Sequence, residues 1–271
     1  MKPVLLLGGT ADARHLAAGL HAQKIPFIYS VAGLVRQPAV SGEVISGGFS
    51  QRGGLAAFIK RRGIVAIVNA VHPFASKMTE EAEKVSVQCK IPYWRFLRPA
   101  WQIQAGDQWV SCEDWHTIAA QMLAYKNVLF TAGQLPQRVL DHIKPEQQAW
   151  MRTAVVPKTT LPVNCQWIKA IGPFDIESER QLFVEHKIDV LVSKNSGGMA
   201  TYAKIAVARQ LSLPILMLDR PQVEFSASTY ADLKDCLSRC AQWYYSSVLR
   251  NDTTSAVLRN EITAKACKIS R

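Results

Sequence analysis

Five consecutive residues in this 271-residue chain combine types and order that suggest anion binding. They follow the apolar run 190–192 and read Lys194, Asn195, Ser196, Gly197 and Gly198. A buried parallel strand that ends in a glycine turn directs backbone N–H groups and the next helix N-terminus toward negative charge. The segment therefore indicates an anion cradle containing Lys194. An ordinary turn with a solvated Lys194 is the alternative.

A second turn of this kind lies near the N-terminus. The apolar run 4–7 leads into Gly8, Gly9 and Thr10, and a helical pattern follows. Thr10 is a typical N-cap, and the neighbouring N–H groups can bind a phosphate. Arg14 falls in the first helical turn, where an anionic ligand would offset its unfavourable interaction with the helix dipole. The spacing is not G-x-G-x-x-G, so this segment alone indicates a dinucleotide weakly, and Arg14 as a solvated surface residue is the alternative.

His72 and Pro73 follow a third apolar run, 64–68. Ligands of open α/β sheets bind at the carboxyl ends of the strands, so His72 is expected to face a crevice. A histidine before proline is also a common turn residue that hydrogen-bonds to the backbone. Both interpretations are open from the sequence.

Apolar runs and amphipathic stretches alternate along most of the chain. This alternation predicts an α/β protein with two Rossmann-like doubly wound parallel-sheet domains and an active site in the cleft between them. The polar stretch 102–108 is the expected linker, giving domains 1–101 and 102–245 and a basic tail, 246–271. Strands are predicted at 4–7, 27–30, 43–45, 65–69, 92–95, 109–111, 128–131, 151–156, 166–171, 189–193 and 214–218. Helices are predicted at 11–21, 54–61, 76–88, 113–124, 176–186, 200–210 and 230–244.

Composition narrows the function classes. Lys and Arg total 32 against 21 Asp and Glu, a formal net charge of +11. The basic residues are dispersed and match no nucleic-acid motif, so we expect no nucleic-acid partner. The positive charge is expected either to attract a polyanionic small molecule or only to increase solubility. No apolar run is long enough for a membrane span or a signal peptide, so a cytoplasmic protein is expected, and we expect a monomer. The six cysteines lack metal-site spacing, which predicts no metal and no disulfide, with Cys236 and Cys240 as core thiols.

Several motifs occur together in a characteristic order. They are 7–10 (Leu-Gly-Gly-Thr), 47–49 (Gly-Gly-Phe), 72–75 (His-Pro-Phe-Ala), Arg98-Pro99 with Trp101, Thr131 with Gly133, 172–174 (Gly-Pro-Phe), 194–198 (Lys-Asn-Ser-Gly-Gly) and 219–221 (Asp-Arg-Pro). In these motifs the chain resembles the precorrin-6A reductase family of cobalamin biosynthesis, including its cobalt-precorrin-6A branch. The resemblance runs from about residue 4 to about residue 221.

The resemblance implies an oxidoreductase that uses NADPH to reduce one double bond of an anionic tetrapyrrole, metal-free or cobalt-bearing. NADP rather than NAD also fits the second strand, 27–30, which ends without Asp or Glu and has Arg36 shortly beyond it. The expected cofactor residues are Gly8, Gly9, Thr10, Arg14, Arg36, Asn195, Ser196, Gly197 and Gly198. The expected catalytic residues are His72 and Lys194, and the expected substrate contacts are Arg98, Lys204 and Arg220. Another NADP-dependent reductase and a non-catalytic NADPH-sensing protein are the alternatives.

Overall fold

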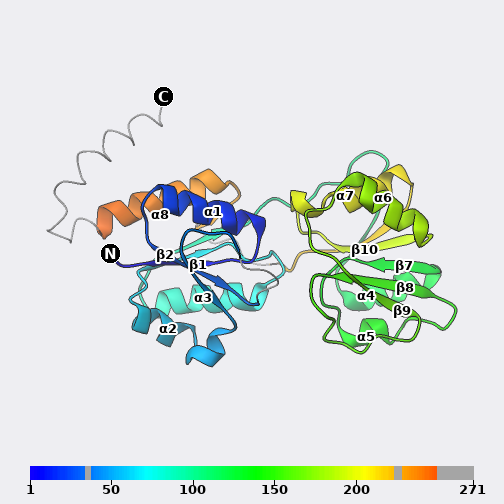
Figure 1. The fold of residues 1–271 in the computed structure, drawn as a ribbon, viewed down its shortest axis with the longest axis horizontal. Coiled ribbons are helices and arrows are strands. Elements are labelled where there is room, and N and C mark those ends of the chain that lie inside the picture. Colours follow the sequence, from blue (N-terminus) through cyan, green and yellow to red (C-terminus); the bar gives the residue numbers. More distant parts are fainter. Residues whose placement is uncertain (34–37, 223–227, 249–271) are drawn as a thin grey trace. The chain divides into compact units, whose positions relative to one another are not determined.

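The computed structural model describes residues 1–33, 38–222 and 228–248, which form two compact units (Figure 1). Unit 1 is Met1–Leu97 with the chain from Phe225 onward, and unit 2 is Arg98–Glu224. Each unit contains a six-stranded sheet with helices on both faces, which confirms the predicted α/β class and the two doubly wound parallel sheets. The units are described separately below.

The sheet of unit 1 has the strand order found in dinucleotide-binding folds. From one edge to the other it runs β3 (Glu43–Ser46), β2 (Phe27–Val31), β1 (Val4–Leu7), β4 (Ala66–Asn69), β5 (Tyr93–Phe96) and β12 (Thr229–Tyr230). All five pairings are parallel. Because helices cover both faces, β1, β2, β4 and β5 are buried throughout, which explains their apolar sequences. The strand order reverses between β1 and β4, where such sheets bind ligands.

Two helical layers enclose this sheet (Figure 1). Helices α1 (Ala11–Ala22) and α8 (Leu233–Ser247) pack on one face. Helices α2 (Leu55–Arg62) and α3 (Ser76–Gln88) pack on the other, together with the short 3-10 helix η1 (Phe49–Arg52). The helices therefore cover the two faces of the sheet, and loops lie at the carboxyl ends of its strands.

Unit 2 repeats this design. Its strands run β9 (Cys165–Lys169), β8 (Gln148–Thr153), β7 (Asn127–Phe130), β10 (Val190–Lys194), β11 (Pro214–Leu218) and β6 (Gln108–Cys112), all parallel. Helices α6 (Ile176–Glu185) and α7 (Ala203–Gln210) cover one face, and α4 (Trp115–Gln121) and α5 (Gln137–Leu140) the other (Figure 1). The 3-10 helices η2 (Met122–Ala124) and η3 (Met199–Thr201) lie in the connections.

The edge strand β12 of the unit 1 sheet is separated along the chain from the other five strands of that sheet. After five strands in unit 1 the chain leaves to form β6 of unit 2, and after unit 2 it returns to form β12 and α8 of unit 1. The domain prediction 102–245 is wrong at its C-terminal end, because α8 belongs to unit 1. The apolar face of α8, with Cys236, Cys240 and Tyr244, completes the core above α1. The two cysteines are buried thiols, as predicted.

Another domain boundary and several element boundaries also differ from the prediction. The first unit ends at Leu97, not at residue 101, because the segment from Arg98 to Trp101 is hydrogen-bonded to the loop after β10. Strand β8 begins at Gln148, three residues before the predicted 151, since its polar first residue pairs with Asn127. The tail 246–271 lies outside the described residues beyond position 248.

Within residues 1–33, 38–222 and 228–248, no helix is long and apolar enough to cross a membrane. In the same part of the chain, no group of three or more His, Cys, Asp or Glu side chains is arranged to hold a metal ion.

Candidate active site

A pocket of about 720 Å³ opens at the carboxyl end of the unit 1 sheet. Its wall is formed by the loops after β1, β2, β3 and β4 and by the first turns of α3, and it includes Gly8, Gly9, Gly33, Gly48 and His72. The volume lies in the range of small-molecule and cofactor sites. The pocket also occupies the point at which the strand order reverses, where Rossmann-like sheets bind ligands.

The turn after β1 has the geometry that two glycines permit. Gly9 has a φ of 103°, which L side chains rarely adopt. Thr10 then caps α1, as predicted: its Oγ1 accepts the Ala13 N–H at 3.0 Å and donates to the Ala70 carbonyl at 2.9 Å. The hydroxyl of Thr10 therefore orders the turn and ties it to the loop after β4. The first backbone N–H groups of α1 face the same turn.

Arg14 and Arg36 are the two arginines of unit 1 that were predicted to bind the cofactor, and the structure describes only Arg14. Arg14 is exposed in the first turn of α1, and its Nη1 donates to the Thr10 carbonyl at 3.4 Å. It lies beside the glycine turn, where a phosphate would offset its unfavourable position on the helix dipole. Arg36 lies outside the described residues.

His72 lines the pocket and is also a turn residue, so both interpretations of the sequence apply. Its Nδ1 accepts the Phe74 N–H at 3.3 Å. A neutral His72 in this arrangement carries its proton on Nε2. Asn69, at the end of β4, stabilises this turn through hydrogen bonds. Its Oδ1 accepts the Val71 N–H at 3.2 Å, and its Nδ2 donates to Tyr93 Oη at 2.8 Å.

The predicted cradle in unit 2 is corrected in part. The N–H of Asn195 donates to the Leu218 carbonyl at 3.1 Å and that of Ser196 to the Lys194 carbonyl at 2.7 Å. The Asn195 side chain bonds both backbone groups of Trp101, at 2.8 and 3.2 Å. The side chain of Asn195 thus fastens the loop to the segment 98–101, while the backbone N–H groups of Asn195 and Ser196 bond to carbonyls of Leu218 and Lys194. These donors are already bonded within the protein. A 3-10 turn, η3, intervenes before α7, and the helix predicted at 200–210 begins at Ala203.

Arg98 and Arg220 reinforce this fastening. Arg220 donates to four carbonyls, those of Asn195, Ser196, Arg98 and Pro99, at 2.8 to 3.1 Å. Arg98 Nε donates to the Ser196 carbonyl at 2.5 Å. Gly197 permits the approach: its φ is 71°, and a Cβ there would lie 1.9 Å from the Pro99 carbonyl oxygen. The conformation of the loop thus depends on these two guanidinium groups, which were expected to contact the substrate.

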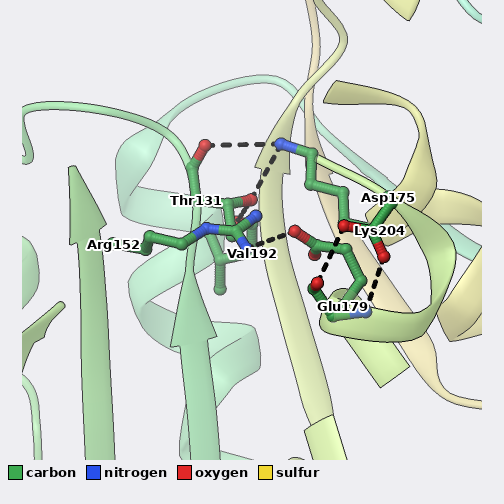
Figure 2. A network of polar contacts seen from close by, with 7 residues as sticks. Thr131, Arg152, Asp175, Glu179, Val192 and Lys204 are labelled. Carbon is green, nitrogen blue, oxygen red and sulfur yellow. Dashed lines mark hydrogen bonds and ion pairs between the residues drawn. The ribbon is translucent and has the colours of Figure 1, made fainter. Parts of the chain in front are cut away.

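Lys204 is buried, with 4 % of its surface exposed, contrary to the expectation of a substrate contact. Figure 2 shows its Nζ donating to Thr131 at the end of β7, at 2.9 Å to Oγ1 and 3.4 Å to the carbonyl. Beside it, Arg152 of β8 forms a buried ion pair with Glu179 of α6. Thr131 in turn donates to the Val192 carbonyl at 3.0 Å, so the network joins β7, β8 and β10 to α6 and α7.

Lys194 is the half-buried cation at the carboxyl end of β10. Its Nζ lies 5.6 Å from the centre of the Trp115 ring, and burial lowers the pKa of its ammonium. A cation that has lost part of its water gains more from an anionic partner than a solvated one does. Of the candidates in unit 2, Lys194 is best suited to bind a carboxylate or phosphate.

Comparison with known proteins identifies the family of a chain that contains these two Rossmann-like units. The family model for precorrin-6x reductase CbiJ/CobK matches residues 3–241. The chain belongs to this reductase family. It is 35% identical to the precorrin-6A reductase of Rhodococcus erythropolis over 88% of this chain and 97% of the relative. It is 32% identical to that of Rhodobacter capsulatus over 82% of this chain and 90% of the relative. A solved structure of CobK precorrin-6A reductase has a TM-score of 0.79 at 31% identity, covering 89% of this chain and 97% of that one.

Sequence reasoning missed several residues of this family member that organise its candidate site. Tyr29 of β2 accepts the Gly9 N–H, and Asn69 holds the His72 turn. Arg152 and Glu179 surround Lys204. A polar residue at the end of an apolar strand, as at Asn69, was the available signal. The partners of Tyr29 and Arg152 lie on other strands or on helices, so their spacing in the sequence gives no indication of contact.

The buried Lys204 predicts a pH-dependent stability. Burial, and secondarily repulsion by Arg152 and Lys194, lowers its pKa to about 7, while Glu179 acts in the opposite direction. Below pH 7 both the folded and unfolded states hold the proton. Between about pH 7 and the unfolded value of 10.5 only the unfolded chain holds it, so stability rises with pH across this window, by roughly 1.4 kcal/mol per unit at most.

We therefore expect wild type to gain on the order of 2 kcal/mol relative to Lys204→Met between pH 7 and pH 9. Urea unfolding of both proteins at several pH values measures the difference, in which the titration of other groups cancels. Parallel stability curves would show that Lys204 keeps its proton when buried.

Proposed function

We propose that this protein reduces one double bond of precorrin-6A, or of its cobalt form, with NADPH in cobalamin biosynthesis. The observation that carries the proposal is the glycine-lined pocket at the β1–β4 switch point of a chain that belongs to a reductase family over nearly its whole length. A reductase needs a reductant, and this pocket has the position and size for a dinucleotide.

The residues present fit NADPH. The positive φ of Gly9 and the N-terminus of α1 offer backbone approach to a pyrophosphate, with Arg14 beside them. The described residues after β2, from Ala32 to Gly33, contain no carboxylate that would bind a free ribose diol and repel a 2′-phosphate. Gly8, Gly9 and Arg14 would hold the cofactor, with Arg36 as the candidate for the 2′-phosphate.

When bound, NADPH supplies a hydride to one carbon of the substrate double bond, and a proton then adds to the neighbouring carbon. His72 is our candidate to deliver that proton from Nε2, with a water molecule as the alternative donor. Lys194 would bind a substrate carboxylate, because the macrocycle carries acetate and propionate groups. The pocket walls would exclude water from the bound cofactor and orient its nicotinamide.

The deciding experiment mixes purified protein with NADPH and either precorrin-6A or cobalt-precorrin-6A, and follows both the macrocycle absorbance and NADPH oxidation. We expect the protein to reduce one of these two substrates, and to reduce it more slowly when NADH replaces NADPH. NADPH that binds but stays unoxidised with both substrates would favour the sensing alternative. A small-carbonyl reductase would need a Tyr and Lys acting together, whereas Tyr202 and Lys204 bond to Arg209 and Thr131 respectively.

Removing the cation at the end of β10 should reduce catalysis strongly. We expect Lys194→Ala to lower kcat/KM roughly 10- to 100-fold, since a charge-assisted hydrogen bond contributes about 1.5–3 kcal/mol. Lys126→Ala is the matched control, because Lys126 is exposed at the amino end of β7. Unchanged circular dichroism confirms folding. Equal kcat/KM in both variants would remove Lys194 from the site.

Salt should weaken substrate binding more than cofactor binding. The chain has a net charge of +11, and a macrocycle with several carboxylates would contact more of its cationic side chains than NADPH would. Salt screens such contacts over a Debye length of about 10 Å at 0.1 M. We expect the tetrapyrrole KM to rise more steeply with salt than the NADPH Kd. A flat tetrapyrrole KM would show that the basic surplus serves solubility.

A further inference from the structure

Tyr29 explains why the turn after β1 begins with glycine. It lies on β2, next to Leu6 of β1 in the parallel register, and its side chain is fully buried. Its ring reaches across the end of β1: a Cβ on Gly8 would lie 2.4 Å from Tyr29 Cζ and 2.6 Å from Oη. Residue 8 is therefore glycine because a phenol occupies the space, whatever ligand binds outside.

The same phenol fixes the next residue through a hydrogen bond. Gly8 N–H donates to the Ser30 carbonyl at 2.8 Å and is the last amide in the ladder between β1 and β2. The chain then turns at Gly9, whose N–H donates to Tyr29 Oη at 3.0 Å. Without that acceptor, Gly9 would keep its unusual φ of 103° with no bond from its own amide to hold it. One side chain thus defines both glycines that line the pocket.

The state of the hydroxyl suits this role. Burial raises the pKa of Tyr29 above its usual value, and the Gly9 bond and Arg14 lower it by less, so the phenol is neutral at physiological pH. A neutral phenol that accepts the Gly9 N–H still has one proton to donate. Tyr29 is fully buried and is not among the residues that line the pocket, so its hydroxyl acts on a ligand through the Gly8-Gly9 turn.

We propose that Tyr29 is a positioning residue for the bound dinucleotide: it holds the Gly8-Gly9 turn in the conformation that admits a phosphate. This inference rests on the proposed NADPH-dependent function. Its structural part is separate, since the Tyr29–Gly9 bond joins two groups of the protein itself.

The test compares wild type with Tyr29→Phe, which keeps the ring and removes the hydroxyl. The matched control is Tyr244→Phe. Tyr244 is equally buried, and its hydroxyl donates to the Lys2 carbonyl at 2.8 Å, just before the amino end of β1 and away from the glycine turn at its carboxyl end. Calorimetry gives the NADPH Kd, and amide hydrogen exchange by NMR gives the protection of Gly9. Thermal unfolding reports stability.

We expect Tyr29→Phe to weaken NADPH binding about three- to tenfold, the usual effect of one lost hydrogen bond, and to speed exchange of the Gly9 amide. Tyr244→Phe should leave both unchanged. In wild type, the Gly9 amide should be protected without ligand and more so with NADPH, a result that requires no variant to fold.

Two results would overturn the inference. One is equal NADPH affinity in folded Tyr29→Phe and wild type, and the other is an unprotected Gly9 amide in wild type. If wild type itself fails to bind NADPH, the proposed function fails first, and the role of Tyr29 toward that cofactor fails with it. The two failures are therefore distinguishable by the wild-type titration alone.

Discussion

Gly9→Val is expected to abolish measurable NADPH binding, with a loss of affinity of roughly 100-fold or more. A β-branched residue cannot adopt a φ of 103° without strain, and correcting the backbone would turn the Gly9 N–H away from Tyr29. A Cβ at Gly9 meets no atom within 4 Å, so the added side chain does not clash with the protein but enters the open space of the pocket wall. The backbone strain and the blocked approach of the phosphate to the backbone would both lower the affinity for NADPH.

The control is Gly63→Val. Gly63 also has a positive φ, 61°, and open space around a Cβ, but it ends α2 and does not line the pocket. Both variants should lose similar stability by thermal unfolding, while only Gly9→Val loses NADPH affinity in calorimetry. Normal NADPH binding by folded Gly9→Val would mean that the cofactor binds elsewhere.

Gly197→Ala is expected to destabilise unit 2 by roughly 3–5 kcal/mol, the cost of a steric collision with rigid backbone added to that of a forbidden φ. The new methyl would lie 1.9 Å from the Pro99 carbonyl oxygen and 2.7 Å from Arg220 Nη2. The loop cannot move away cheaply, because Asn195 and Arg220 hold the opposing segment through several hydrogen bonds. Release of the loop would also displace Lys194.

The neighbouring glycine provides the control. A methyl at Gly198 meets its nearest atom, in the Arg98 guanidinium, at 3.5 Å, which is ordinary contact, and its φ is −84°. Gly198→Ala should therefore cost less than about 1 kcal/mol. Urea unfolding followed by tryptophan fluorescence measures both variants, since most of the seven tryptophans lie in unit 2. Equal unfolding midpoints for the two variants would contradict the fastening of this loop to Pro99.

The same loop shows how far sequence reasoning reaches. Lys-Asn-Ser-Gly-Gly after an apolar strand correctly indicated a special turn, and Gly197 does have a positive φ. The sequence could not reveal that Asn195 and Ser196 bind the segment 98–101, because their partners lie about a hundred positions away. A cradle and a fastened loop require the same residue types, and only the tertiary contacts distinguish them.

The sequence by itself determined the two parallel sheets, the glycine turn before α1, the Thr10 cap and the family. These follow from local physics: strand and helix periodicity, backbone freedom at glycine and side-chain capping act within a few residues. The tertiary structure alone decided that β12 and α8 return to unit 1, that Lys204 is buried against Thr131 and that Tyr29 supports Gly9. Each of these depends on which distant strand or helix covers an apolar face, and burial of that face is a property of the whole fold rather than of any sequence segment.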